Sequence, residues 1–489
     1  MPAWFSRSLL IGGVFSLVWL VVVYTWRVNN RMPNAMDVAL YFIACPIALL
    51  IVFWLICKAW GFATSPIALK NSAEVTESAA IAAGKAEDAE RTAANERGLS
   101  VGIFATVIRS AHGSSAEELT ANLTANEAQL DLDPELKNRD GFPVLSGRIS
   151  EIDEDAQRDA FSSWCELQGR AKLDWSAEQL RAMSIAAEVT IELAQEIVQH
   201  PLFDPYISAI AKNHEVPLLP TLQLMIVLPK SWGAEHIQLM NDWVFDLIQQ
   251  QGWPAEKISF RSVHNASPTC ALAAIDLLML DSYRMSQTCF ALLLACDSHI
   301  GEATIEKWED AGKLFVGKNS NAHIPGEAAA AILLGDETQA KLMALETNVI
   351  LHRVGQSRRS KSIEAKGSAG DSILEQMIQD ALAISKISAE KISLISSDTG
   401  PCSNRIVELM SVGFKVFPDL DPAEQYFKLT SNCGDIGAVA SVVALALGHF
   451  QVINETAPAL CISNMDPHER TVALLSPWGD AAVNSVTNT

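Results

Sequence analysis

The sequence predicts an α/β protein preceded by a pair of membrane-spanning helices, and three observations lead to this prediction. Two apolar runs without a charged residue lie near the N-terminus, at 8–26 and 38–57. From residue 99 onward, apolar strand-like runs alternate with amphipathic helix-like segments. The alternation restarts near residue 340, so we expect two α/β halves of mostly parallel sheet, each covered by helices on both faces.

The two N-terminal runs are long enough to cross a bilayer. At about 1.5 Å per residue, a helix of either length spans a hydrocarbon core of about 30 Å. Their aromatic residues lie mainly toward the ends, as they do at membrane interfaces. We therefore expect a transmembrane hairpin over residues 1–70, followed by an Ala- and Glu-rich linker over 71–97. A pair of buried core helices is the alternative.

Charge is divided between these regions. Residues 1–70 carry five Lys or Arg and one Asp, a net charge of +4, so the chain's net charge of −21 leaves −25 on residues 71–489. Nucleic acid and anionic lipid would repel such a domain, and its expected charged partner is a basic protein surface. Seven of the nine cysteines lie outside the predicted spans. An odd number of thiols, several inside apolar runs, favours reduced cysteines in a cytoplasm.

Strand and helix signals follow one another in a regular order after residue 98. Ser267 at a cap position, followed by Pro268, is a strong signal for a helix start. The expected strands are 99–108, 221–229, 257–263, 289–296, 327–335, 391–397 and 413–418, with a late hairpin near the C-terminus. The expected helices are 114–130, 232–253, 267–280, 373–385 and 436–450.

Several of these segments resemble, in the right order, those of the thiolase-like ketoacyl synthases. The resemblance covers about residues 99–480 and implies a layered αβαβα fold of two similar halves, 98–338 and 339–489. In such a fold PGEAAAAILLG (325–335) is a central strand, and we expect Glu327 to accept backbone N–H bonds or to pair with a base. The segments are 99–123, 142–153, 291–300, 325–335, 394–401 and 428–447.

The same resemblance implies where the family's chemistry would lie. A ketoacyl synthase needs a cysteine thiolate at a helix N-terminus and two histidines that stabilise an oxyanion. Cys270 matches the acyl-accepting cysteine. The histidines are replaced, since the two corresponding loops carry Asp398 and Cys433-Gly434-Asp435. A carboxylate repels an oxyanion, so we expect a pseudoenzyme whose vestigial pocket contains Cys270, Asp398, Cys433 and Asp435.

Other site types find little support in the sequence. We expect no cofactor and no metal, because no metal-ligand spacing and no phosphate-binding loop is present. His264 lies six residues before Cys270, which leaves a Cys/His hydrolase as an alternative. The segment 352–367 is basic within an acidic domain. It is interpreted as a mobile solvated loop, a flap over the pocket, or a docking loop formed by Arg353, Arg358, Arg359 and Lys361.

The membrane-proximal N-terminus and the segment Phe142–Ile149 resemble the type VI secretion lipase-adaptor family of proteobacteria. This implies a non-catalytic adaptor or scaffold at the bacterial inner membrane, with its large domain in the cytoplasm, that binds a lipase-type effector and presents it to the secretion spike protein. By analogy with the fold, a homodimer would form along the strand near 289–296. The alternatives are a membrane-tethered acyltransferase or condensing enzyme that uses Cys270, and a structural component that positions a secretion machine.

Overall fold

The computed structural model describes residues 92–478, apart from gaps at 171, 264–266, 317–318, 320–321, 344–348 and 366–371. The chain divides into two compact units, Met1–Ala89 and Glu90–Thr489. The predicted spans 8–26 and 38–57 lie outside the described residues. Within the described part of the chain, no helix is both long and apolar enough to cross a membrane. The described residues thus provide no support for the predicted inner-membrane location.

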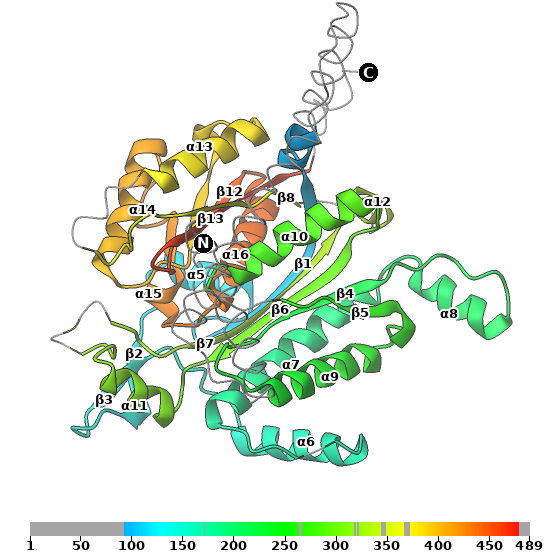
Figure 1. Cartoon of the computed structure of the whole chain (residues 1–489), viewed down its shortest axis with the longest axis horizontal. Coiled ribbons are helices and arrows are strands. Elements are labelled where there is room, and N and C mark those ends of the chain that lie inside the picture. The colour runs from blue at the N-terminus through cyan, green and yellow to red at the C-terminus, as the bar shows by residue number, and fades with distance from the viewer. Residues whose placement is uncertain are drawn as a thin grey trace, which may run out of the picture. The chain divides into compact units, whose positions relative to one another are not determined.

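A mixed sheet of eleven strands forms the frame of the second unit (Figure 1). The expectation of a mostly parallel sheet is wrong, because six of its ten strand pairs are antiparallel. A continuous apolar run reports burial on both faces and carries no information about strand direction. Along the sheet the order is β11 (Tyr426–Lys428), β10 (Leu394–Ser397), β12 (Ala459–Ser463), β13 (Glu469–Pro477), β8 (Val349–His352), β1 (Ser100–Ser110), β7 (Glu327–Gly335), β6 (Phe290–Ser298), β4 (Leu222–Val227) and β5 (Ile258–Phe260), while β9 (Gly355–Arg358) pairs with β13.

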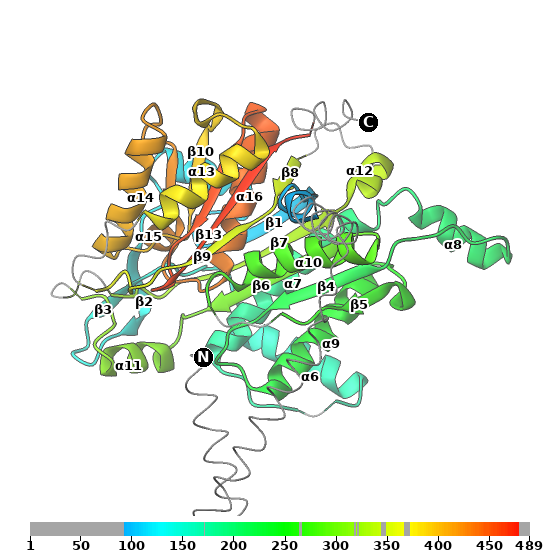
Figure 2. The ribbon, with the colours of Figure 1, turned by 45° about the horizontal axis from the view of Figure 1, so that its top comes forward.

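Helices pack against this sheet in three groups (Figures 1 and 2). The helices α7 (Ala177–Ile197) and α9 (Ala234–Gln250) share a core with one face of β4, β6 and β7. The second group shares a core with strands along most of the sheet, from β10 and β12 to β6 and β4. It consists of α5 (Ala116–Thr124), α10 (Cys270–Met285) and α16 (Val439–Glu455) and is called the middle helices. The helices α13 (Ile373–Ser385) and α14 (Ser403–Val416) pack on β10, β12 and β13. The remaining elements are α6 (Glu154–Leu167), α8 (Phe203–Lys212), α11 (Glu302–Asp310), α12 (Glu337–Met343), α15 (Leu429–Cys433) and the hairpin of β2 (Asp131–Lys137) and β3 (Pro143–Ser146).

The two most apolar runs become β6 and β7, and every residue of both strands is buried. Along β7, Ala328 and Ala330 face the middle helices, whereas Ala329 and Ala331 face α7. Small side chains on both faces let the helices approach the strand closely. Because β6 pairs with β4 on one edge and with β7 on the other, it has no edge to offer a second copy of the chain. Both edges of β6 are thus occupied within the chain, and the homodimer itself stays a prediction.

Glu327 begins β7 and is fully buried. Its carboxylate accepts hydrogen bonds from the Ile149 backbone N–H (2.7 Å) and the Ser298 hydroxyl (2.9 Å). The Arg181 guanidinium, from α7, donates to both carboxylate oxygens, at 2.8 and 2.5 Å. Arg181 is itself 3% exposed. The expected structural role of Glu327 is confirmed, since it accepts a backbone N–H and also pairs with a base.

Candidate functional site

Cys270 is the first residue of α10, and the loop before it is tied to strand β13. The Glu469 carboxylate on β13 accepts hydrogen bonds from the hydroxyls of Ser267 (2.6 Å) and Thr269 (2.9 Å). The Cys270 N–H donates to the Ser267 carbonyl at 3.0 Å, which closes the turn into the helix. The Ser267-Pro268 signal therefore predicts the helix start to within a few residues, and the tertiary contact with Glu469 positions the thiol.

An open cavity of about 400 Å³ lies beside Cys270. Polar side chains on the facing strands β9 and β13 form its opposite wall, and Ala273 on α10 contributes a small apolar surface. Cys270 itself is 6% exposed. The lining residues are Ser267, Thr269, Cys270, Ala273, Gln356, Ser357, Arg358, Glu469, Arg470 and Thr471.

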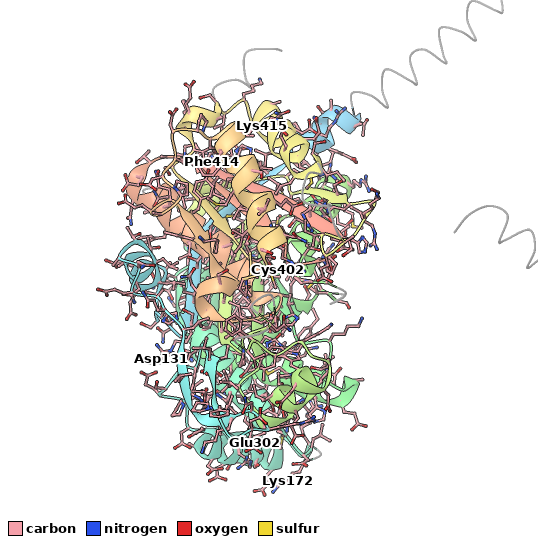
Figure 3. The ribbon with its side chains drawn as sticks, turned by 90° about the vertical axis from the view of Figure 1, so that its left-hand side faces the viewer. Asp131, Lys172, Glu302, Cys402, Phe414 and Lys415 are labelled. Atoms are coloured by element: carbon pink, nitrogen blue, oxygen red, sulfur yellow. The ribbon has the colours of Figure 1, made fainter. Side chains whose placement is uncertain are left out.

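The protonation state of the Cys270 thiol follows from this position. Its pKa is raised to about 11, chiefly by burial and also by the Glu469 carboxylate, against the opposing effect of the backbone N–H groups of Ala271 and Cys270. The thiol is therefore protonated at neutral pH. Cys402 is a second cysteine at a helix N-terminus. It is half-buried at the N-cap of α14, and Phe414 and Lys415 lie toward the other end of that helix (Figure 3).

Two histidines meet at Asp435, although the sequence analysis singled out neither as a catalytic replacement. His323 Nδ1 lies 2.5 Å from the Asp435 carboxylate. His299 Nδ1–H donates to the Asp435 backbone carbonyl at 2.6 Å. A carbonyl can only accept, so this bond fixes the proton on Nδ1 and leaves His299 Nε2 as the titrating atom, 4.0 Å from an Asp297 oxygen. The Trp308 ring lies 5.0 Å from each imidazole.

The charges in this cluster shift one another's pKa values. Burial lowers the pKa of His299, but the carboxylates of Asp297 and Asp435 outweigh it, so the net shift is upward. The pKa of Asp297 is raised, chiefly by burial. Burial alone would raise the pKa of Asp435, yet the hydrogen bond from His323 and the charges of both histidines hold it below its usual range. The cluster is suited to holding and moving a proton.

His299 lines two cavities, and one of them reaches the loop before Cys270. The first, of about 460 Å³, is lined by His299, Asp297, Lys307 and also by Ser267 and Pro268. The second, of about 350 Å³, lies toward Trp308. Ser267 therefore lies in the wall of both the His299 cavity and the Cys270 cavity. A histidine directly after the end of a central strand was the sequence signal for this residue.

Three of the segments that resemble ketoacyl synthases contact one another at glycines, because their backbones approach closely. These segments are 142–153, 325–335 and 428–447. A Cβ atom on Gly147 would lie 2.0 Å from the Cys433 carbonyl oxygen, and one on Gly326 would lie 2.3 Å from it. Gly434 has a φ of +79°, which favours glycine. The Asp435 N–H donates to the Ile324 carbonyl at 2.6 Å. Cys433, fully buried, thus belongs to a backbone junction that places Asp435 beside the histidines.

Asp398 is held apart from the Cys270 cavity. Its carboxylate accepts hydrogen bonds from the Ser463 hydroxyl and from the backbone N–H groups of Asn464 (2.7 Å) and Met465 (3.2 Å). Burial raises its pKa to about 6 despite these bonds. The predicted set of four residues is therefore divided: among the described residues that line the Cys270 cavity, Asp398, Cys433 and Asp435 do not occur. The alternative partner His264 lies outside the described residues.

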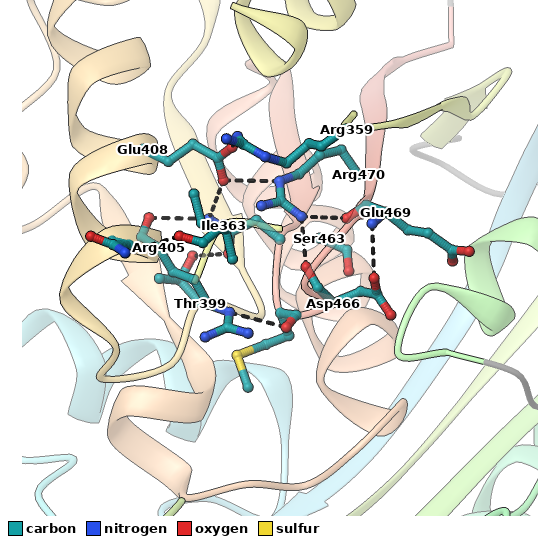
Figure 4. Close-up of polar contacts among 12 residues, drawn as sticks. Arg359, Ile363, Thr399, Arg405, Glu408, Ser463, Asp466, Glu469 and Arg470 are labelled. Atoms are coloured by element: carbon teal, nitrogen blue, oxygen red, sulfur yellow. Dashed lines mark hydrogen bonds and ion pairs between the residues drawn. The ribbon is translucent and has the colours of Figure 1, made fainter. Parts of the chain in front are cut away.

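The predicted docking loop is largely structural. Arg359 is 2% exposed and forms an ion pair with Glu408 on α14, which Arg470 also contacts at 2.9 Å (Figure 4). Arg353 donates to Asp276 at 3.0 Å. Arg358 remains well exposed on β9 and pairs with Glu469. The docking interpretation is wrong for Arg359, because a buried, paired guanidinium cannot meet a partner. The Lys361 backbone carbonyl accepts a hydrogen bond from Arg359 Nε at 3.4 Å.

Comparison with known proteins rests on solved structures, since the sequence matches no protein-family model and no curated protein. The chain is similar to the ishigamide ketosynthase/chain length factor, with a TM-score of 0.50 and 14% identity over 78% of this chain and 99% of that one. It is also similar to the module 6 ketosynthase of the bacillaene synthase from Bacillus subtilis 168, with a TM-score of 0.52 and 12% identity over 78% and 72% of the two chains. The fold is thiolase-like. A third match, the module 1 ketosynthase of the bacillaene synthase from Bacillus amyloliquefaciens FZB42, has a TM-score of 0.53 and 12% identity over 79% and 74%.

These matches correct the predicted function. The chain was expected to be a non-catalytic type VI secretion adaptor, and that prediction is wrong, because the thiolase-like structures that match are ketosynthases. The expectation of a pseudoenzyme falls with it. The alternative, an acyltransferase or condensing enzyme that uses Cys270, fits this thiolase-like fold better.

Proposed function

We propose that this chain is an acyl-thioester-processing enzyme, an acyltransferase or condensing enzyme in which Cys270 carries the acyl group. One observation carries the proposal: Cys270 is the first residue of α10 in the wall of an open cavity, within a thiolase-like fold. The proposal also includes an αβαβα layering in two similar halves. The three groups of helices that pack on the sheet support this layering.

The first half-reaction forms a thioester on Cys270. Its sulfur attacks the carbonyl carbon of an acyl thioester, the new S–C bond forms, and the donor's C–S bond breaks. The thiol proton of Cys270 passes to the departing donor sulfur. Negative charge that develops beside Cys270 is favoured by the positive end of the α10 dipole and by the Ala271 backbone N–H, which also lowers the pKa of the thiol.

The second half-reaction would use His299. An acceptor group carrying a proton enters the cavity that His299 and Ser267 both line. His299 Nε2 takes that proton while the acceptor attacks the thioester carbonyl, and the Cys270 S–C bond breaks. The thiolate of Cys270 then recovers the proton from His299. The Asp435 carbonyl holds the imidazole in the tautomer that this step requires.

Intact-protein mass spectrometry tests the first step. The full-length protein is incubated with acetyl-CoA at pH 7 to 10, and the mass of one acetyl group is expected on wild type and on C402S but not on C270S. C402S is a matched control because Cys402 also lies at a helix N-terminus. An adduct that persists in C270S, or no adduct at any pH, would overturn the proposal.

The role of His299 needs a separate readout. In H299N, acyl-Cys270 should form at the normal rate but be transferred or hydrolysed about 10²-fold more slowly. H236N is the control, because His236 is a half-buried imidazole that donates to a carbonyl elsewhere, that of Asp174. If H299N discharges its acyl group as fast as H236N, His299 has no part in the reaction.

A further inference from the structure

A residue that lines the cavity beside Cys270 carries a buried hydroxyl, and no other described residue is its hydrogen-bond partner. Thr471, on β13, is 1% exposed, and its Oγ1 has no hydrogen-bond partner among the described residues. A buried polar atom left unpaired costs stability, so each instance in a folded protein calls for an explanation. Thr471 lines the same cavity as Cys270.

The position of Thr471 on its strand determines the face of the sheet on which its side chain lies. Residues two apart on a strand share a face of the sheet. Glu469 faces α10, as its bonds to Ser267 and Thr269 show, and Thr471 therefore faces α10 as well. Arg470, between them, points to the opposite face, where it meets Glu408. Thr471 and Glu469 thus lie on the α10 side of β13, and both line the Cys270 cavity.

The other side chains that line the cavity are mostly polar, and Glu469 among them already has hydrogen-bond partners. Glu469 accepts two hydroxyls from the loop before α10 and pairs with Arg358 at 3.3 Å. Gln356 lies opposite Thr471 in the β9–β13 pairing and is exposed. Apart from Cys270, Ala273 contributes the single apolar side chain of the described lining. An unbranched hydrocarbon chain in this cavity would leave Thr471 unpaired and remove polar groups from water.

We infer that the acyl group carried by Cys270 is short and bears a hydroxyl or similar hydrogen-bonding group near its carbonyl, which pairs with the Thr471 hydroxyl. The inference rests on the proposed acyl transfer to Cys270 and names the substrate class of that site. Thr471 is then a specificity-determining residue. It contacts the substituent of the acyl group, not the bond that breaks.

The test compares two thioesters that differ by one group of similar size. The full-length protein is incubated with 3-hydroxybutyryl-CoA or with isovaleryl-CoA, which has a methyl group in place of the hydroxyl. The rate at which Cys270 gains each acyl group is followed by intact mass. In wild type, 3-hydroxybutyryl should be taken up about tenfold faster, the effect of one well-placed hydrogen bond to a buried group.

Substitution of the hydroxyl provides the second arm. T471V keeps the shape of the side chain and should take up the two acyl groups at about equal rates. T190V is the matched control, because Thr190 is also fully buried and its Oγ1 has no partner within the described part of the chain, but it lies on α7, away from this cavity. T190V should keep the wild-type preference.

The outcomes separate this inference from the proposed function. Equal rates for the two thioesters in wild type overturn the inference even if T471V fails to fold, while leaving acyl transfer intact. A tenfold preference that survives in T471V also overturns it. If neither thioester nor acetyl-CoA acylates Cys270, the proposed function is wrong and the inference falls with it.

Discussion

The reactivity of Cys270 toward an alkylating reagent should report its raised pKa directly. With a pKa of about 11 instead of the ordinary value of 9.0, about 10⁻⁴ of the thiol is ionised at pH 7 instead of about 10⁻². The thiolate is the nucleophile, so iodoacetamide should react with Cys270 about a hundredfold more slowly at pH 7 than with an ordinary thiol. The rate should then rise about tenfold per pH unit up to about pH 10.5.

Peptide mass spectrometry after timed labelling measures this rate for Cys270 alone. E469Q provides a second perturbation. Burial is the main cause of the raised pKa and stays in place, but removal of the Glu469 charge lowers the pKa, so the variant should react severalfold faster at neutral pH. T190V serves as a control that leaves the cavity unchanged. A rate for wild type that levels off below pH 9, or one that E469Q decreases, would refute the reasoning.

Three further predictions concern the frame around the site. R181M should destabilise the protein by about 3–5 kcal/mol in urea titrations, because Glu327 stays buried without its base. R181M/E327M should recover much of this loss, and equal losses of stability in the two variants would contradict the reasoning. The stability contributed by protonated Asp398 is fully present below about pH 3.8 and is lost as the pH rises through about 6. D398N should therefore gain stability relative to wild type between pH 4 and pH 7, by about 3 kcal/mol, and a constant difference would argue against the raised pKa. G326A should lose about 1–3 kcal/mol of unfolding free energy, since its Cβ would meet the Cys433 carbonyl, and an unchanged denaturation midpoint would show that the junction can relax.

Several features could be predicted from the sequence because their causes are local. The apolar runs at 289–296 and 327–335 had to be buried on both faces, and they form β6 and β7. The cap signal Ser267-Pro268 placed Cys270 in the first turn of a helix. The buried glutamate at the start of β7 required donors, because a carboxylate without partners is too costly to bury. The order of the motifs was enough to predict the thiolase-like fold.

Other predictions failed because the local signal was ambiguous. The segment 413–418 was expected to be a strand, yet most of it lies in α14, whose apolar residues pack on the sheet. Short apolar runs do not separate strand from buried helix. The basic segment at 352–367 was interpreted as exposed, but Arg359 is buried because Glu408 on α14 comes to meet it. Charge along the sequence does not show which charges will find a partner.

The sequence by itself therefore determined which segments are apolar, where α10 starts and which residue types reach the site. Only the tertiary structure decided the direction of the strands and the composition of the site. His323 and Asp435 are 112 residues apart, and His299 and Asp435 are 136 apart. No local pattern encodes these contacts. They arise because the glycines at 147, 326 and 434 let three backbone segments approach closely, and that approach brings two imidazoles to the aspartate where the sequence analysis expected none.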